Sequence, residues 1–523
     1  MPQKRICLKI DGREIHSKEG ITILEAAKLA GIPIPHICTH KALSNIECCR
    51  MCLVKISGYD PLQPACTTEV LDGMIVETNN EEVKKSRVWN LKYHLINHPA
   101  ACHTCEKTGE CKLQDLYMKY GLYSSDEDSR QKSTRFYPIN KHVILDYSKC
   151  ILCGRCAIFL REYFAFEIPN SIKNKKTLIN ISPPERVTGN YTLNLTDLCP
   201  TGALISRDFR HRSPVWKLAE FDSICIGCGT GCNIKFCHRE NVIHRIIPRY
   251  NEKINKFFMC DHGRSIYHHH NIENRLSSPL KKVKKAMLEI EWTEAITDIS
   301  TEIKKRIAFK QNNKIAVVMT PSLSLEDLFS IEYIFRQKLK ANIFLYTNND
   351  IESLKKDKDN FLIHQEKNPN TAGINFFENQ FEKYLPLDTL EEKDPDIILF
   401  FSPGNSRSYP SLENLVQKFC ERNKFFIYAA SNLNFKLKKA SLILPLKTYI
   451  EKKSTFINKS GIIQKQSLGI SIVENALSVF EFCEMIEVSI GKFTLANMLS
   501  SFMSQVDDLF KGHVNNQNQQ NSP

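Results

Sequence analysis

The 523-residue sequence lacks any apolar run that approaches the ~18–20 residues needed to cross a bilayer. Its first residues, MPQKRICLKIDGREI, pass straight into a strand-like alternation. Neither an apolar signal core nor a long Arg- and Ser-rich transit segment precedes them. We therefore expect a chain that is made and kept in the cytosol.

Signatures of common catalytic sites are also missing. We find no Ser–His–Asp set, no P-loop and no paired-carboxylate pattern. The net charge of +13 comes from lysines scattered through an Asn- and Ile-rich sequence, without the aromatic-interleaved basic stripe that reads nucleic-acid bases. The positive charge thus indicates a compositional bias rather than a nucleic-acid partner.

Cysteine is scarce in the second half of the chain and abundant in the first. Of twenty cysteines, eighteen lie at or before Cys260, and only Cys420 and Cys483 follow. In a reducing compartment such cysteines are metal ligands more often than disulfides. This asymmetry is the strongest domain-boundary signal in the sequence.

The first set of spaced cysteines follows a predicted hairpin and helix. Residues 5–10 alternate, Asp11-Gly12 is a turn signal, and a helix is expected at about residues 22–30, with a Thr22–Glu25 capping box and Gly31 at its end. A small β-grasp unit is suggested. The spacing C-x10-C-x2-C-x13-C suits a [2Fe–2S] cluster, with tetrathiolate zinc as the alternative; its members are Cys38, Cys49, Cys52 and Cys66. Cys48 and Cys7 are expected to be bystanders.

The second set follows a predicted amphipathic helix at residues 81–97 that Pro99 ends. The spacing is H-x3-C-x2-C-x5-C, from His98, Cys102, Cys105 and Cys111. Three thiolates within ten residues need a fourth donor, and neutral imidazole supplies one without adding charge. Zinc competes on spacing alone, but the neighbouring cluster motifs favour [4Fe–4S].

The third set has the C-x2-C-x2-C run of bacterial ferredoxins and a later Cys-Pro segment; its members are Cys150, Cys153, Cys156 and Cys199. Leu160 stands where a two-cluster ferredoxin has a further cysteine. Gly189, Thr192 and Leu195 stand at the positions of a second run. One cubane is therefore expected here rather than two.

The fourth set has the spacing C-x2-C-x3-C-x27-C; its members are Cys225, Cys228, Cys232 and Cys260. Glycines at 227, 229 and 231 would let the backbone wrap a cluster closely. They lack the strand and helix context of a dinucleotide-binding loop. Cys237 lies nearby but off the spacing, so a third [4Fe–4S] cluster without it is predicted.

From about residue 290 the pattern becomes that of an α/β, doubly wound domain. A helix is expected at residues 293–307, and Ser324 and Asp327 cap the next one. Short apolar strands are expected at residues 314–320, 342–346, 396–401 and 424–430. Residues 511–523 are polar, which predicts a disordered tail.

Together the four ordered motifs resemble the large iron–sulfur subunit of respiratory complex I, the G-type subunit family of bacterial NADH–quinone oxidoreductase. The segment 440–464 is similar to a late pattern of that family, which Glu451, Thr455, Asn458, Gly461 and Gln464 fit. Lys453 or Ser454 replaces a usual Gly, and Ile462 replaces an Arg. The intact fourth set implies a bacterial member.

The resemblance implies a multidomain α+β then α/β chain. Its expected parts are a β-grasp [2Fe–2S] ferredoxin-like domain (1–80), a helical His/Cys [4Fe–4S] domain (81–120), a ferredoxin-like [4Fe–4S] domain (140–215), a [4Fe–4S] domain of molybdopterin-oxidoreductase type (218–275) and a truncated α/β molybdopterin-oxidoreductase-like domain (285–510). The shortness of the last part and the lack of a molybdenum-ligand motif predict no molybdenum–pterin cofactor. No flavin is expected either.

The implied function is electron transfer from a flavin in an NADH-binding partner subunit toward quinone-side subunits, coupled to proton translocation by the complex. The chain itself would have no substrate site and would lie peripherally at the cytoplasmic side of the bacterial inner membrane, attached through the complex. Alternatives are a formate dehydrogenase alpha-type subunit, a diaphorase subunit of an NAD-reducing hydrogenase, and a zinc scaffold.

Overall fold

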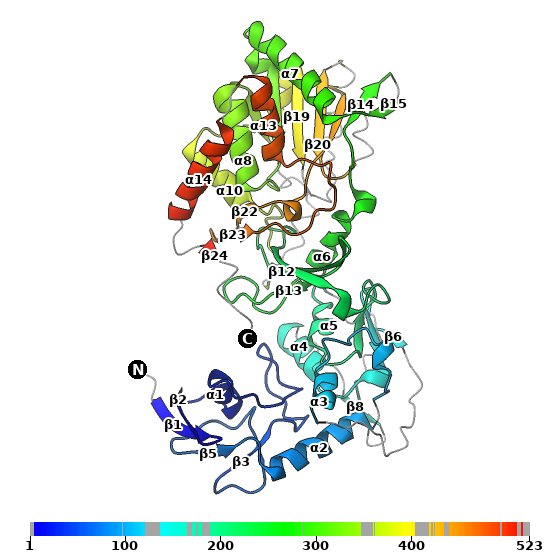
Figure 1. Cartoon of the computed structure of the whole chain (residues 1–523), viewed down its shortest axis with the longest axis vertical. Helices are drawn as coiled ribbons and strands as arrows, with labels where there is room; N and C mark the ends of the chain where they lie inside the picture. The colour runs from blue at the N-terminus through cyan, green and yellow to red at the C-terminus, as the bar shows by residue number, and fades with distance from the viewer. Residues whose placement is uncertain are drawn as a thin grey trace. The chain divides into compact units, whose positions relative to one another are not determined.

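The computed structural model divides into two compact units, Met1–Leu218 and Ala219–Pro523, which are described separately (Figure 1). The residues described are 5–96, 98–120, 136–164, 170–173, 176–179, 189–284, 286–346, 359, 361–402, 418–419, 422, 424–433, 439–491, 494–509 and 514–515. Among them, no helix combines the length and the apolar character that crossing a membrane requires.

The first unit begins with a mixed five-stranded sheet in the order β2-β1-β5-β3-β4. Its strands are β1 (Arg5–Ile10), β2 (Arg13–Lys18), β3 (Leu53–Ile56), β4 (Gln63–Pro64) and β5 (Ile75–Glu77), and helix α1 (Ile23–Leu29) shares their core. Asp11 and Gly12 both have positive φ, as the predicted hairpin turn requires. The predicted Thr22–Glu25 capping box is confirmed.

The rest of the first unit is built from short helices and a small sheet, and one core joins its parts. Its elements are α2 (Glu81–Leu95), η1 (Cys102–Thr104), α3 (Lys112–Tyr120), β6 (Phe136–Pro138), β7 (Val143–Asp146), η2 (Tyr147–Lys149), α4 (Arg155–Phe164), β8 (Asn170–Lys173), β9 (Lys176–Ile179), α5 (Asn194–Leu198), β10 (Leu204–Ser206) and η4 (Val215–Lys217). The three-stranded sheet has the order β10-β7-β6, and β8 and β9 form a separate two-stranded sheet. A single buried cluster contains Cys38, Cys49, Cys111 and Cys153, so three of the four cysteine sets share one core.

The second unit begins with an antiparallel three-stranded sheet that the sequence analysis did not predict. The strands are β11 (Ala219–Ile224), β12 (Asn233–Arg239) and β13 (Val242–Pro248). The short helices α6 (Asp261–Ser265), η5 (Ile266–His269) and η6 (Ile272–Asn274) follow. The fourth cysteine set lies in the turns of this part.

An eight-stranded sheet dominates the second unit, in the order β15-β14-β21-β20-β19-β16-β17-β18. Six strands are parallel, and the β14–β15 hairpin joins antiparallel to β21. The strands are β14 (Leu280–Val283), β15 (Ala286–Glu289), β16 (Ile315–Met319), β17 (Asn342–Leu345), β18 (Leu385–Pro386), β19 (Ile397–Ser402), β20 (Phe425–Ala430) and β21 (Leu442–Pro445). The four predicted strands are thus confirmed within two residues at each end.

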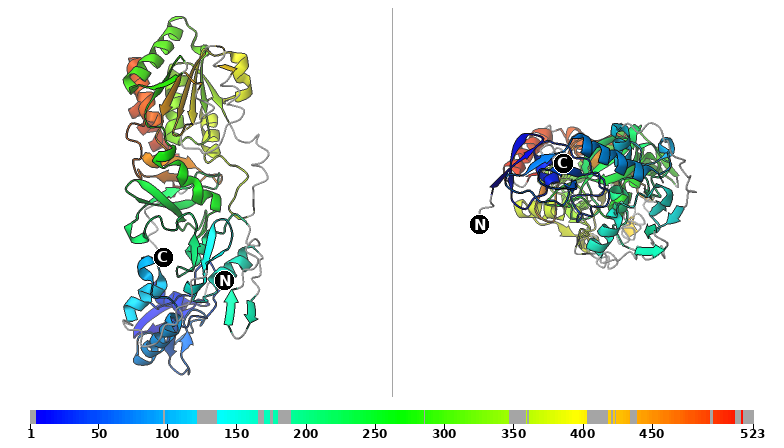
Figure 2. Two further views of the ribbon diagram at one scale, coloured as in Figure 1. Left: turned by 90° about the vertical axis from the view of Figure 1, so that its right-hand side faces the viewer. Right: turned by 90° about the horizontal axis from the view of Figure 1, so that it is seen from below.

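Buried residues cover both faces of this sheet, as a parallel sheet requires. Figure 2 shows helices of the second unit lying beside the sheet. One face packs against α7 (Trp292–Ala308), α8 (Leu325–Ile331), the π-helical η8 (Glu332–Lys338), α10 (Thr371–Gln380), α13 (Val479–Ser489) and α14 (Leu495–Leu509). Leu390 of α11 (Leu390–Lys393) and Phe419 pack on the other face. The shorter η7 (Asn312–Lys314), η10 (Leu387–Thr389) and η12 (Tyr449–Glu451) complete the helices described here. The predicted helix at 293–307 and the Ser324–Asp327 cap are confirmed.

A second hairpin, β22 (Ser454–Ile457) and β23 (Ile463–Gln466), carries the late motif. Within the predicted disordered tail 511–523, Val514–Asn515 form a short strand, β24, parallel to β23. The other residues of that tail lie outside the described part of the chain.

Candidate metal centres

The first cysteine set is drawn together at the edge of the N-terminal sheet. Cys52 immediately precedes β3 and Cys66 follows β4, while the other two members come from the loop after α1. All four residues are at most 2% exposed. Hydrogen bonds from the thiols of Cys48 and Cys49 lower the pKa of Cys38 to about 2. A hydrogen bond from Cys52 lowers the pKa of Cys66 to about 7. The four predicted donors therefore lie as two pairs, and Cys48, which was expected to be a bystander, also lies beside Cys38.

The second set lines one pocket, and the predicted histidine is part of it. The pocket is lined by His98, Pro99, Ala101, Cys102, Cys105, Thr108, Cys111, Gln114, Lys149 and Gly202. His98 follows α2, where its backbone N–H bonds to the carbonyl oxygen of Leu95. Burial raises the pKa of the Cys102 and Cys111 thiols, because the charged thiolate loses its hydration there.

Lys149 and Gly202 line the second pocket, although they lie in the part of the chain that carries the third set. A methyl group on Gly202 would lie 2.5 Å from Cys105 Sγ. Any side chain larger than that of glycine would therefore clash with this sulfur atom. The Lys149 ammonium pairs with Asp146 at 3.3 Å and Glu106 at 3.8 Å. The Cys-Pro-Thr-Gly-Ala segment therefore serves the second site as well as the third.

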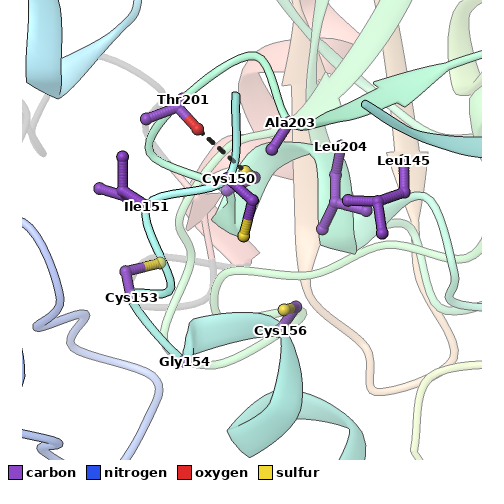
Figure 3. A pocket seen from close by; sticks show the side chains of 10 residues that line it. Leu145, Cys150, Ile151, Cys153, Gly154, Cys156, Thr201, Ala203 and Leu204 are labelled. Atoms are coloured by element: carbon purple, nitrogen blue, oxygen red, sulfur yellow. Dashed lines mark hydrogen bonds between the residues drawn. The ribbon is translucent and has the colours of Figure 1, made fainter. Parts of the chain in front are cut away.

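The third set surrounds a pocket with apolar walls (Figure 3). The sulfur atoms of Cys150, Cys153 and Cys156 face a common space there. The other lining residues are Leu145, Ile151, Gly154, Cys199, Thr201, Ala203 and Leu204. Burial raises the pKa of Cys153 to about 12, and burial also raises the pKa of Cys156. Leu160, at the position of the missing second-cluster ligand, is buried in α4.

The fourth set lies between β11, β12 and α6. Cys225 follows β11, Cys232 precedes β12, and Cys260 is the N-cap of α6. Backbone N–H groups donate to two of the sulfurs: Gly227 to Cys225 at 3.4 Å and Gly263 to Cys260 at 3.3 Å.

A Cβ on Gly263 would lie 3.0 Å from Cys225 Sγ and 3.5 Å from Cys260 Sγ, so these two sulfurs converge there. Burial raises the pKa of Cys260 to about 12, and the thiols of Cys225, Cys228 and Cys260 add to the raised pKa of Cys232. The fourth set is thus one cluster of thiols.

The late motif holds the loop of the fourth set. Gln464 Nε2 donates to the carbonyl oxygen of Gly231 at 2.8 Å, and Asn458 Nδ2 donates to that of Thr230 at 3.4 Å. A Cβ at Gly231, whose φ is +66°, would collide with Gln464 Oε1. Two residues of the sequence pattern thus fix the backbone that presents Cys228 and Cys232.

Glu451 and Thr455 of the late motif are buried and paired. Glu451 Oε2 lies 2.7 Å from Arg275 Nη1. Thr455 Oγ1 donates to Glu326 at 2.6 Å. These two positions stabilise the core of the second unit rather than touching a cysteine.

Among the residues that the structure describes, the remaining cysteines form no further set of four. Cys7 donates to Glu14 at 3.3 Å, while Cys237 and Cys483 are buried on β12 and α13. Cys48 is exposed, and its thiol donates to the carbonyl oxygen of Cys153 at 3.3 Å. Cys420 lies outside the described residues.

The donor chemistry of the four sites fits iron–sulfur clusters. Every cysteine of the four sets is a free thiol, and most are buried. Burial disfavours a bare thiolate, and a bound metal offsets that cost. Thiolates are the usual ligands of [2Fe–2S] and [4Fe–4S] clusters.

Four family models match the chain in order. They describe a 2Fe-2S iron-sulfur cluster binding domain (residues 3–81), an NADH-ubiquinone oxidoreductase-G iron-sulfur binding region (87–126), a ferredoxin-like domain of NADH-quinone oxidoreductase subunit 3 (141–205) and a molybdopterin oxidoreductase Fe4S4 domain (218–271). The chain is related to the G-type subunits of NADH-quinone oxidoreductase. It carries domains of the 2Fe-2S and 4Fe-4S binding types.

Relatives of the G-type family extend the match beyond the cysteine-rich half. The second G-type subunit of the NADH-quinone oxidoreductase of Rhizobium meliloti is 31% identical over 64% of this chain and 39% of its own length. The 75 kDa subunit of NADH-ubiquinone oxidoreductase from Reclinomonas americana is 26% identical over 95% of this chain and 72% of its own. The match thus spans less than half of the first relative and most of the second.

A solved structure is similar to part of the chain. A chain of an NAD+-reducing [NiFe]-hydrogenase is 27% identical, with a TM-score of 0.32, over 40% of this chain and 91% of its own.

Proposed function

We propose that this chain is an electron-carrying subunit of an NADH:quinone oxidoreductase. Electrons would enter from a flavin in an NADH-binding partner subunit and leave toward quinone-side subunits of a proton-translocating complex. The observation that carries the proposal is the convergence of all four predicted donor sets, in the order of the four family models.

The first set, Cys38, Cys49, Cys52 and Cys66, is proposed to hold a [2Fe–2S] cluster. The other three sets are proposed to hold one [4Fe–4S] cluster each; they are His98 with Cys102, Cys105 and Cys111; Cys150, Cys153, Cys156 and Cys199; and Cys225, Cys228, Cys232 and Cys260. When bound, such clusters exchange single electrons.

The residues of this chain would set the potentials and exclude water. The apolar walls of the third pocket, Leu145, Ile151 and Leu204, keep solvent from the thiols. The N–H donors of Gly227 and Gly263 stabilise negative charge on sulfur at the fourth site.

The finer organisation is part of the same proposal. We propose domains at residues 1–80, 81–120, 140–215, 218–275 and 285–510. The C-terminal region would bind neither molybdenum–pterin nor flavin. The chain would lie peripherally at the cytoplasmic face of the inner membrane. The formate dehydrogenase and hydrogenase alternatives are not favoured, because relatives that match this chain are subunits of NADH-quinone or NADH-ubiquinone oxidoreductases.

The test is purification of the full chain without oxygen, followed by EPR during a redox titration. We expect signals from one [2Fe–2S] and three [4Fe–4S] clusters. In membranes of a host that lacks its own counterpart of this chain, the chain should restore NADH-dependent quinone reduction. A colourless protein with stoichiometric zinc would support the scaffold alternative and contradict the proposal.

A further inference from the structure

Arg155 is a buried positive charge between two ligands of the third set. It is the first residue of α4, between Cys153 and Cys156, and it is 2% exposed. A guanidinium group offers five N–H donors and stays protonated in proteins. Removing such a charge from water is unfavourable unless hydrogen bonds and opposite charge compensate it.

Its hydrogen bonds join the first and third sets. Nε donates to the carbonyl oxygen of Cys38 at 3.3 Å, and Nη2 donates to that of Thr39 at 2.6 Å. Nη1 donates to the carbonyl oxygen of Leu198 at 3.2 Å. Cys38 belongs to the first set, and Leu198 directly precedes Cys199 of the third, so one planar group fixes the backbone at both.

These acceptors are neutral, so they satisfy the donors without balancing the charge. Within the described part of the chain, no carboxylate forms an ion pair with Arg155. The ionisable groups whose charge would act on it are the thiols of both sets: Cys153, Cys199, Cys38 and Cys49. With metal bound these sulfurs are thiolates, and the sites that they form are negative.

Three further contacts, none of them between charged groups, join residues 42–48 to residues 153–163 near Arg155. The Cys48 thiol donates to the carbonyl oxygen of Cys153, and the Tyr163 hydroxyl donates to that of Ala42 at 2.9 Å. The Ile46 side chain packs against Gly154, where a Cβ would lie 3.2 Å from it. The two loops therefore meet over an area that keeps water from the guanidinium.

We propose that Arg155 is a shared positioning residue and counter-charge for the first and third clusters. Its hydrogen bonds fix the positions of both ligand loops. Its charge stabilises the added electron on either cluster, because a nearby buried cation favours the more negative, reduced form. The inference rests on the proposed function, since it requires clusters at both sites.

The test is Arg155→Met in the full chain, with EPR-monitored redox titration of every cluster. The midpoint potentials of the first and third clusters should both shift to more negative values. Those of the second and fourth clusters should stay unchanged and serve as internal references. Iron release to a chelator should be several-fold faster at the two affected sites.

Two further variants separate charge from geometry. Arg155→Lys keeps the positive charge but cannot make the three hydrogen bonds to the carbonyl oxygens of Cys38, Thr39 and Leu198. The midpoint potentials should therefore shift less than in Arg155→Met, while iron release stays as fast as in that variant. Arg161→Met removes the same charge from an exposed position on α4 and should leave all four potentials unchanged.

A shift at neither site, or at one alone, in Arg155→Met would overturn the shared role. If that variant does not take up clusters, Arg155→Lys decides: a shift at both sites supports the proposal, and unchanged potentials and iron release overturn it. Absence of the two signals from the wild-type chain would instead overturn the proposed function, and this inference with it.

Discussion

Among single residues, those that leave room for a sulfur atom or could serve as a ligand beside it decide whether a site can hold a cluster. His98 is the one donor that is not a cysteine, and it lines the pocket of the second set. Gly202 touches Cys105 from a segment almost a hundred residues away. Each of these residues supports a separate prediction.

His98→Cys should keep a [4Fe–4S] cluster at the second site but lower its midpoint potential. Thiolate adds a negative charge where imidazole adds none, and a more negative site is harder to reduce. His98→Ala should leave an open iron site and a labile cluster that degrades to a three-iron form. EPR-monitored redox titration follows both effects. An unchanged signal, potential and stability in His98→Ala would assign the fourth ligand to another residue.

Gly202→Ala should empty the second site, because the new methyl group would lie 2.5 Å from Cys105 Sγ. The matched control is Gly227→Ala, whose methyl group would lie 3.4 Å from Cys225 Sγ, an ordinary contact. Iron analysis should show a loss of about four atoms in the first variant and none in the second. Full iron in Gly202→Ala would mean that Cys105 is not a ligand.

At the scale of elements, the β22–β23 hairpin holds the loop of the fourth set in place through hydrogen bonds from Asn458 and Gln464. Gln464→Ala should remove one hydrogen bond to that loop and one to Asn233 Oδ1 at the start of β12, and leave the carbonyl oxygen of Gly231 buried without its donor. Such a loss costs about 1–3 kcal/mol of unfolding free energy. Lys465→Ala on the same strand removes only a partly exposed ion pair with Asp507 and should cost less than about 1 kcal/mol.

Thermal unfolding and chelator-driven iron loss measure this difference. Gln464→Ala should unfold at lower temperature than Lys465→Ala and release iron from the fourth site first. Equal behaviour of the two variants would show that the hairpin contributes nothing to the site.

The elements that sequence predicts well are those set by local chemistry. The Asp11-Gly12 turn, the Thr22 and Ser324 caps and the apolar strand at 315–319 all follow from neighbouring residues. The spacing of the cysteines likewise identified donors that the structure brings together in each set. The assignment of clusters to these donors stays a prediction.

Other contacts could not be predicted, because they join segments far apart in the sequence. Arg155 meets Cys38 across 117 positions, and Gln464 meets Gly231 across 233. The three strands β11–β13 were also missed, since their polar and apolar residues do not alternate regularly. Such features depend on tertiary packing rather than on local preference.

At the scale of the whole molecule, the donors are divided between the two compact units. The first three sets lie entirely within Met1–Leu218, and the fourth lies entirely within Ala219–Pro523. A fragment of residues 1–218 should therefore hold about 10 iron atoms, from one [2Fe–2S] and two [4Fe–4S] clusters. Iron analysis of the anaerobically purified fragment checks this, and a fragment with no more than about 2 iron atoms would show that the cubanes require the second unit.

The most direct test of the central claim is the iron and acid-labile sulfide content of the full chain, purified without oxygen and confirmed by EPR. We expect about 14 iron atoms per chain, in one [2Fe–2S] and three [4Fe–4S] clusters, and no molybdenum or tungsten. About 10 iron atoms would remove one cubane from the assignment. Stoichiometric zinc in place of iron, or about one molybdenum or tungsten per chain, would contradict it.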